Sequence, residues 1–252
     1  MDFIKRANNQ ERFYNDLNDR NHLNHFSEMT FETPIFRTMG DRALLVEVGD
    51  RIAADINEGV RLLLYGLLAK NIPGVVDLVP GYRSLMVTFD PLTLDRKALQ
   101  STIVECWDRK DQMTLPENRE LEIPVVYGGD HGPDLDWVAA HLHLSVETVV
   151  ALHSATTYRV YMIGFTPGYP YMGELPAALK TPRRDTPRTH VPRGSVGIAQ
   201  RQTGIYPFAS PGGWQIIGWT PVNLFDAEAD PPSRLQIGDR VRFKPIGPEE
   251  VA

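Results

Sequence analysis

The stretch GDRALLVEVGDRIAADINEGVRLLLYGLLAK, residues 40–70, changes its hydrophobic period in the middle. Apolar residues occupy alternate positions over 44–48, which is the period of a half-buried strand. After Asp50 they recur at the three- and four-residue spacing of an amphipathic helix. The stretch therefore predicts a strand followed by a helix over 51–70, with Asp50 as the N-cap of that helix.

The neighbouring segments extend this pattern to a split βαβ arrangement. Gly40-Asp41 fits a tight hairpin turn into the first strand. Strands are predicted over 75–79 and 85–89, Asp95 opens a second helix, and a strand over 121–127 closes the series. The order strand–helix–strand–strand–helix–strand is typical of ferredoxin-like domains.

The character of the chain changes after Tyr127. Two short helices are predicted over 135–142 and 146–153, the second capped by Ser145. Beyond them, short apolar runs lie between Gly and Pro residues, over 160–165, 196–199, 214–219 and 241–243. Many short strands with Gly/Pro turns indicate a β-barrel or β-sandwich.

Composition excludes several classes of protein. The 252 residues carry 26 Lys and Arg against 32 Asp and Glu, a formal charge of -6, which argues against non-specific nucleic-acid binding. A single cysteine excludes an intrachain disulfide, and Cys106 falls in an amphipathic helix, where packing is its expected role. Residues 1–29 lack the apolar core of a signal peptide, and no apolar run is long enough to span a membrane. The expected location is the cytoplasm, and no function is assigned to the N-terminal extension.

Common catalytic and metal-binding motifs are absent from the sequence. There is neither a P-loop nor a G-x-G-x-x-G fingerprint for a nucleotide, and no metal site is expected because His141 and His143 point to different faces of a helix. Ser195 is interpreted as a turn residue. His153 ends a helix beside the β-rich region, so it is a candidate catalytic residue, although a histidine is also favoured there by the helix dipole.

The stretch from Gly164 to Trp219 is the most informative for function. Pro and Gly hold aromatic rings in fixed loops at low entropic cost, and Gly pairs let main-chain N–H groups approach an anion. Several arginines lie in the same stretch of an acidic chain, and their planar guanidinium groups suit carboxylate and phosphate. The pattern suggests a pocket for a small anionic molecule, while loop packing with surface arginines is an equally open interpretation.

The same stretch carries a family resemblance through a series of ordered motifs. These are PVVYGG (124–129), GPDL (132–135), GFTPG (164–168), TPRR (181–184), GSVG (194–197), TGIYP (203–207), PGGW (211–214) and LFD (224–226). In these motifs the chain resembles the family of the 5-oxoprolinase B subunit, also called KipI or allophanate hydrolase subunit 1. The resemblance implies an α+β protein with a ferredoxin-like α/β domain over 31–120 and a cyclophilin-like β-barrel domain over 121–252. The N-terminal extension over 1–30 departs from the family pattern.

The resemblance also implies an activity and partners. Members of the family act with a C subunit, which is KipA-like, and an A subunit in the ATP-dependent conversion of 5-oxo-L-proline to L-glutamate. ATP, with Mg²⁺, is expected in the assembled complex, and no cofactor is expected to be intrinsic to this chain. No nucleic acid or membrane is expected as a partner. Two other functions stay open: a KipI-like inhibitor of a sensor histidine kinase, and a carboxyltransferase-type module related to urea carboxylase and allophanate hydrolase.

The candidate site residues come from the stretch that carries these motifs, together with His153 at the end of its helix. His153, Arg183 and Arg184 are the candidate catalytic residues. The predicted substrate-binding residues are Phe165, Pro167, Gly168, Tyr169, Tyr171, Arg183, Arg184, Arg188, Thr203, Tyr206, Gly212, Gly213 and Trp214. Adjacent residues of an extended chain point to opposite sides, so one of Arg183 and Arg184 is expected to bind the ligand while the other forms a structural ion pair.

Overall fold

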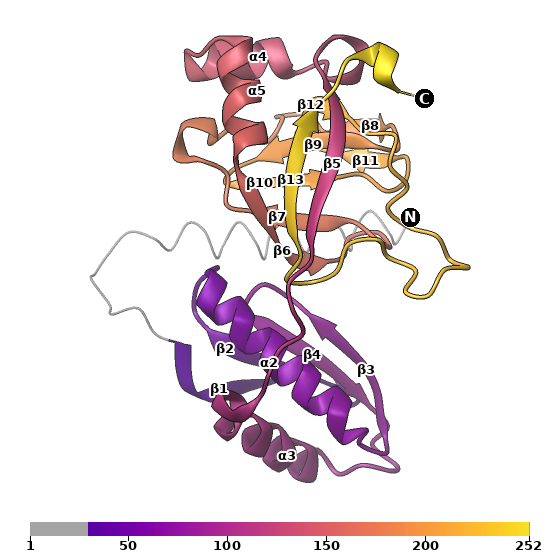
Figure 1. Cartoon of the computed structure of the whole chain (residues 1–252). Helices are drawn as coiled ribbons and strands as arrows, with labels where there is room; N and C mark the ends of the chain where they lie inside the picture. Colours follow the sequence, from indigo (N-terminus) through magenta and orange to yellow (C-terminus); the bar gives the residue numbers. More distant parts are fainter. Residues whose placement is uncertain (1–29, 252) are drawn as a thin grey trace.

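The computed structural model describes residues 30–251 and shows two units, one above the other in Figure 1. Residues 1–29, and with them almost all of the predicted N-terminal extension, lie outside the described residues. We call residues 30–113 the sheet unit and residues 120–251 the barrel unit. The division into independent domains at residue 121 stays a prediction, because sheet membership does not show that either part folds alone.

The sheet unit contains an antiparallel four-stranded sheet in the order β1-β2-β4-β3. Its strands are β1 (Thr30–Thr38), β2 (Ala43–Gly49), β3 (Val75–Pro80) and β4 (Ser84–Phe89). Helices α2 (Ala54–Lys70) and α3 (Arg96–Asp108) cover one face, visible in the lower half of Figure 1. The core between helices and sheet includes Leu44, Val46, Leu63, Ile103 and Trp107, and the thiol of Cys106 packs there as predicted.

The two helices of this unit begin differently. The carboxylate of Asp95 accepts hydrogen bonds from the backbone N–H groups of Lys97 and Ala98, so the predicted cap of α3 is confirmed. The predicted cap of α2 is wrong: the helix begins at Ala54, and the N-cap residue Ala53 offers no side-chain hydrogen bond. Burial of its apolar stripe, rather than a cap, stabilises this helix end.

The strand predicted to close the ferredoxin-like series belongs to the other unit. β5 (Glu120–Tyr127) pairs with two strands of the barrel, and β1 occupies the edge of the sheet beside β2. The alternation of apolar residues identifies a strand but not its partners, because period two is the same in every sheet. The split βαβ core of β2, α2, β3 and β4 remains as predicted.

The barrel unit is a closed barrel of seven strands in the order β10-β7-β6-β13-β5-β12-β9. Besides β5, the strands are β6 (Thr157–Ile163), β7 (Pro170–Gly173), β9 (Ser195–Ala199), β10 (Gln202–Ile205), β12 (Gln215–Trp219) and β13 (Arg240–Pro245). β5 and β13 run parallel and the other described pairs are antiparallel. A separate ribbon joins β8 (Arg188–Val191) to β11 (Ser210–Gly212).

Helices α4 (Leu135–Leu142) and α5 (Val146–Ala155) lie at the end of the barrel away from the sheet unit (Figure 1). Both match their predicted positions, and Ser145 caps α5 as predicted by accepting from Thr148 N at 3.2 Å. Four single-turn 3₁₀ helices complete the described chain: Lys110–Gln112, Gly129–His131, Ala177–Leu179 and Pro248–Glu250.

Residues 170–173 differ from their prediction as part of an irregular loop. They form β7, which pairs with both β6 and β10 in the barrel wall. Pro170 is tolerated because it is the first residue of the strand, where the missing N–H costs little.

Two side chains of α2 connect the two units, and a third binds the segment that joins them. The Asn57 amide nitrogen lies 2.9 Å from Tyr161 O in the barrel and 3.2 Å from Tyr82 O in the sheet unit, and Asn57 is fully buried. Glu58 pairs with Arg159 of β6, and the buried Arg61 donates to Asn118 Oδ1 at 2.8 Å. The two units are therefore joined by the buried amide of Asn57 and by a partly exposed ion pair, as well as by the chain.

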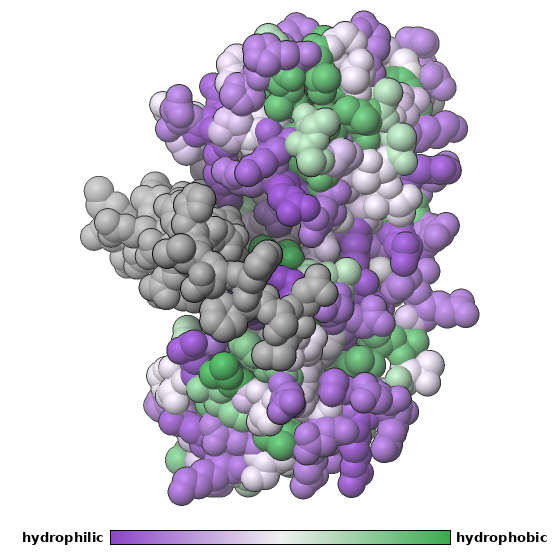
Figure 2. Space-filling model, turned by 90° about the vertical axis from the view of Figure 1, so that its left-hand side faces the viewer, coloured by the Kyte–Doolittle hydropathy of each residue, from purple (hydrophilic) through white to green (hydrophobic). Residues whose placement is uncertain are grey.

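The molecular surface is mixed rather than uniformly polar. On the face shown in Figure 2, small groups of apolar residues lie among hydrophilic ones on both units. Within residues 30–251, no single helix is both long enough and apolar enough to cross a membrane. Taken together, the bent pair of α4 and α5 meets these two criteria by length and composition only.

Candidate functional site

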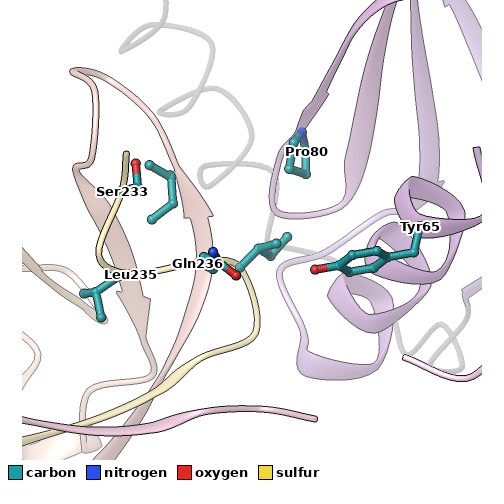
Figure 3. A pocket seen from close by; sticks show the side chains of 7 residues that line it. Tyr65, Pro80, Ser233, Leu235 and Gln236 are labelled. Carbon is teal, nitrogen blue, oxygen red and sulfur yellow. The ribbon is translucent and has the colours of Figure 1, made fainter. Parts of the chain in front are cut away.

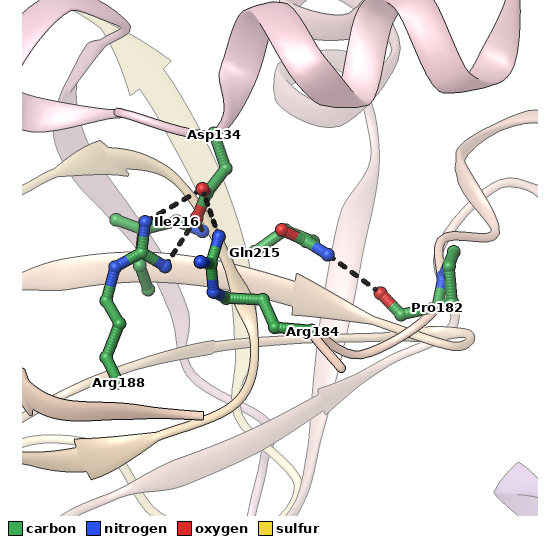
Figure 4. A network of polar contacts seen from close by, with 6 residues as sticks. All are labelled: Asp134, Pro182, Arg184, Arg188, Gln215 and Ile216. Carbon is green, nitrogen blue, oxygen red and sulfur yellow. Dashed lines mark hydrogen bonds and ion pairs between the residues drawn. The ribbon is translucent and has the colours of Figure 1, made fainter. Parts of the chain in front are cut away.

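A buried carboxylate, Asp134, binds two of the predicted site arginines (Figure 4). Arg188 approaches it with both terminal nitrogens, at 2.8 Å to each carboxylate oxygen, and Arg184 Nη1 donates to Oδ1 at 2.9 Å. The backbone N–H of Ile216 donates to Oδ2 at 2.6 Å. The hydrogen bonds to Asp134 raise the pKa of Arg188 above its ordinary value. These contacts with Asp134 hold both guanidinium groups in place.

The local fold explains why Asp134 reaches this position. It occupies the N-cap position of α4, yet its side chain makes no capping hydrogen bond and turns toward the arginines instead. Its own N–H donates to Ile216 O at 2.9 Å, so backbone and side chain both bind β12. Gly132, two residues earlier, allows this close approach, because a Cβ there would lie 2.2 Å from Ile217 O.

The loop that carries the arginines is held against β11 and the start of β12. Arg184 N donates to Gly213 O at 2.8 Å, and Gly212 is the register partner of Arg188. The buried Gln215 donates from Nε2 to Pro182 O at 3.2 Å, as Figure 4 shows. The structure thus brings Arg184, Arg188 and the two predicted glycines together.

The predicted aromatic residues form a cluster beside this loop. Tyr169 packs against Tyr171, Tyr206 and Trp214 with ring centroids 4.9, 5.2 and 6.0 Å apart. Burial raises the pKa of Tyr206 to about 12, although the positive charge of Arg183 acts to lower it. The charge of Arg183 therefore lies close to the phenols of this cluster, while Tyr169 itself is buried rather than lining an open surface.

The turn at residues 165–168 presents one aromatic ring to solvent. Phe165 is 49% exposed and has a φ of +70°, a conformation unusual for a bulky residue. Gly168 has a φ of +78°, and a Cβ there would lie 2.8 Å from the Cβ of Phe225. The rings of Phe165 and Tyr169 meet edge to face with centroids 5.7 Å apart, so Phe165 borders the aromatic cluster from outside. In the same turn Pro167 is exposed and Gly168 is buried.

His153 and Thr203 lie in the barrel interior. His153 is fully buried, with Nε2 at 2.9 Å from the Thr203 hydroxyl and Nδ1 at 2.7 Å from the Tyr127 hydroxyl. Burial lowers the pKa of His153 to about 3, so the ring is neutral at pH 7. Phe243 stacks on it at 4.6 Å, which makes this a histidine of the barrel core.

Sequence reasoning missed Asp134, although the residue lies within one of the family motifs. An Asp immediately before a predicted helix is ordinarily interpreted as a cap. The sequence signal that could have found Asp134 is charge balance. A cluster of arginines in a folded loop needs a nearby carboxylate, and an Asp in a family motif is a candidate for it.

A cavity of about 350 Å³ lies elsewhere, between the two units (Figure 3). Tyr65 of α2 points across it toward Gln236. Its lining residues are uncharged and include none of the predicted site residues; they are Tyr65, Pro80, Ile163, Ser233, Leu235, Gln236 and Ile237. In the part of the chain that the structure describes, no three His, Cys, Asp or Glu side chains are grouped as metal ligands.

Comparison with known proteins places these features in a family. Residues 34–235 match the family described as the carboxyltransferase domain, subdomain C and D. The chain is 44% identical over 208 residues to the 5-oxoprolinase B subunit of Escherichia coli O157:H7, covering 82% of this chain and 94% of that protein. It is 38% identical over 222 residues to the 5-oxoprolinase B subunit of Bacillus subtilis strain 168, covering 84% and 92%.

Two longer proteins contain a similar part. Urea amidolyase of Lachancea kluyveri is 26% identical over 247 residues, which cover 86% of this chain and 13% of that protein. The crystal structure of TTHA0988 has a TM-score of 0.73 at 40% identity, and the match covers 82% of this chain. This chain spans only 40% of the length of TTHA0988.

Proposed function

This chain belongs to the family of the carboxyltransferase domain, subdomain C and D, and on that premise we propose that it is the B subunit of a 5-oxoprolinase. The observation that carries the proposal is the 44% identity over 94% of the Escherichia coli protein of that name. In this proposal the chain acts in the cytoplasm with the C and A subunits, and the complex converts 5-oxo-L-proline to L-glutamate with ATP.

The role of this chain is to bind and orient the substrate. Arg184 and Arg188 present fixed positive charge beside the aromatic cluster, which suits a small anionic molecule. In this proposal ATP and Mg²⁺ act in the assembled complex, and neither is intrinsic to this chain. His153, neutral and enclosed in the barrel core, supports the barrel rather than the reaction in this proposal.

The test is reconstitution with both partner subunits. The assembled complex is expected to release glutamate from 5-oxo-L-proline only with ATP, and the isolated chain is expected to be inactive. Glutamate release by the single chain would show that the subunit role is wrong. An intact complex that releases no glutamate would overturn the proposed activity.

Arginine variants test the substrate-binding role. Replacing Arg184 or Arg188 by Ala should lower kcat/KM of the complex roughly ten- to hundred-fold, the value of a charge-assisted hydrogen bond. Lys at either position should recover only part of the loss, because an ammonium group lacks the bidentate fork. Arg201→Ala is the matched control, since Arg201 pairs with the exposed Glu174 on the barrel surface.

A carboxyltransferase module is the second candidate, favoured by the similarity to urea amidolyase. That function would require a biotin-carrying partner and urea as the acceptor. Urea-dependent ATP hydrolysis by the assembled complex, without turnover of 5-oxo-L-proline, would favour it.

A further inference from the structure

The cluster around Asp134 carries an excess of one positive charge. One carboxylate, with 6% of its side chain exposed, meets two guanidinium groups, whose side chains are 34% exposed in Arg184 and 24% exposed in Arg188. A buried carboxylate is fully balanced by one such group. The second group therefore leaves a net charge of about +1 at the edge of the site.

The two arginines also have hydrogen-bond donors left over. A guanidinium carries more N–H groups than Arg184 and Arg188 give to Asp134. Arg184 Nε is buried and has no hydrogen-bond partner among the described residues. Unused donors on two partly exposed guanidinium groups, held by the same carboxylate, form a receptor for planar acceptor groups.

We propose that Asp134 is a positioning residue that holds Arg184 and Arg188 as a preformed receptor for one carboxylate group of the substrate. This inference rests on the proposed function, because it names the group of the substrate that the site binds. A net charge of about +1 matches a carboxylate monoanion better than a phosphate dianion. The planar carboxylate also fits the planar donor edges of two guanidinium groups.

The diversion of Asp134 from its helix supports a positioning role. An Asp at an N-cap position typically stabilises its helix through a capping hydrogen bond. Asp134 makes no such bond, and both of its oxygens bind the site instead. The hydrogen bond from Ile216 N fixes the carboxylate to β12 in the barrel wall, so the two arginines that bind this carboxylate are held in place by the strand.

Asp134→Asn separates positioning from simple attraction, because the two effects have opposite signs. The substitution removes a negative charge, so attraction alone would strengthen the binding of any anion. A positioning role predicts the reverse for a carboxylate. The assembled complex should bind 5-oxo-L-proline roughly tenfold more weakly, and KM should rise by a larger factor than kcat falls. Positioning also predicts that the variant binds inorganic phosphate more tightly relative to a carboxylate than the wild type does, since the site becomes more positive and less ordered.

Asp239→Asn is the matched control. Asp239 is equally buried, accepts from Arg119 Nε at 2.9 Å and from Gln236 N at 2.7 Å, and lies outside the proposed site. It should lower the melting temperature as Asp134→Asn does without changing KM. If Asp134→Asn does not fold, Arg188→Lys keeps the charge but loses the bidentate contact, and should weaken 5-oxo-L-proline binding by a similar factor.

Binding by the isolated, ¹⁵N-labelled chain distinguishes this inference from the enzyme activity. Sodium acetate, titrated into the chain, should shift the Nε–H signals of Arg184 and Arg188 at lower concentration than inorganic phosphate, whatever the complex turns over. Stronger carboxylate binding in Asp134→Asn, or equal binding of 5-oxo-L-proline and its uncharged carboxamide, would overturn the proposal. Suppose that acetate shifts the Nε–H signals of these arginines in the isolated chain while the assembled complex releases no glutamate. That result would refute the enzyme activity but would still support the carboxylate receptor.

Discussion

The buried histidine of the barrel makes stability depend on pH. The pKa of His153 is lowered by burial to about 3, against an ordinary value of 6.5. The unfolded chain therefore binds a proton at this residue between those values while the folded chain does not. Each pH unit below 6.5 should lower the free energy of unfolding by up to about 1.4 kcal/mol from this residue alone. Urea titrations at pH 7, 6, 5 and 4 measure the slope.

The histidine variant and its control isolate this contribution. His153→Gln keeps a side chain that can bond Tyr127 and Thr203 but cannot titrate, so its stability should fall less steeply with acid. His141→Gln changes an exposed histidine on α4 and should leave the wild-type slope intact. The same steep slope in His153→Gln would mean that other groups dominate the acid response.

At the level of elements, the two aspartates that precede helices of the sheet unit give contrasting expectations. Asp95→Ala removes two hydrogen bonds to the first turn of α3 and should lower the free energy of unfolding by about 1 kcal/mol. Asp50→Ala should change it little, because α2 begins at Ala54 without a side-chain cap. Thermal melts of both variants check the pair, and equal losses would show that the cap of α3 is not the cause.

Local patterns predicted elements better than they predicted partners. The helices α3, α4 and α5 were found because caps and helical periods are encoded by neighbouring residues. The placement of β5 was wrong because strand pairing depends on residues more than a hundred positions away, such as those of β13. Asp134 was missed for the same reason: its partners Arg184 and Arg188 are distant in sequence, and only the fold brings them together.

At the level of the whole molecule, Asn57 is expected to couple the two units. Its amide nitrogen is within hydrogen-bond distance of carbonyls on both sides of the junction, and the residue is fully buried. Asn57→Ala leaves these carbonyls without that donor and should lower stability by about 1–3 kcal/mol. The indole N–H signals of Trp107 in the sheet unit and Trp219 in the barrel, followed in urea, should disappear together in the wild type and separately in the variant.

An exposed amide provides the comparison for that experiment. Asn223→Ala alters a loop residue whose side chain makes only a 3.4 Å contact with Phe225 N, and it should leave both transitions unchanged. Coincident, unshifted transitions in Asn57→Ala would show that the connecting chain and the remaining contacts suffice to couple the units.

The parallel seam between β5 and β13 has a consequence for biosynthesis. The first strand of the barrel is complete at Tyr127, but its seam partner begins only at Arg240, more than a hundred residues later. A ribosome must therefore release the chain through β13 before the barrel can close, because β5 and β6 both pair with that strand. A product that ends before Arg240 keeps two unpaired strand edges, which are templates for aggregation. Only a chain that includes β13 buries these edges, and chains that end before it remain substrates for chaperones and proteases.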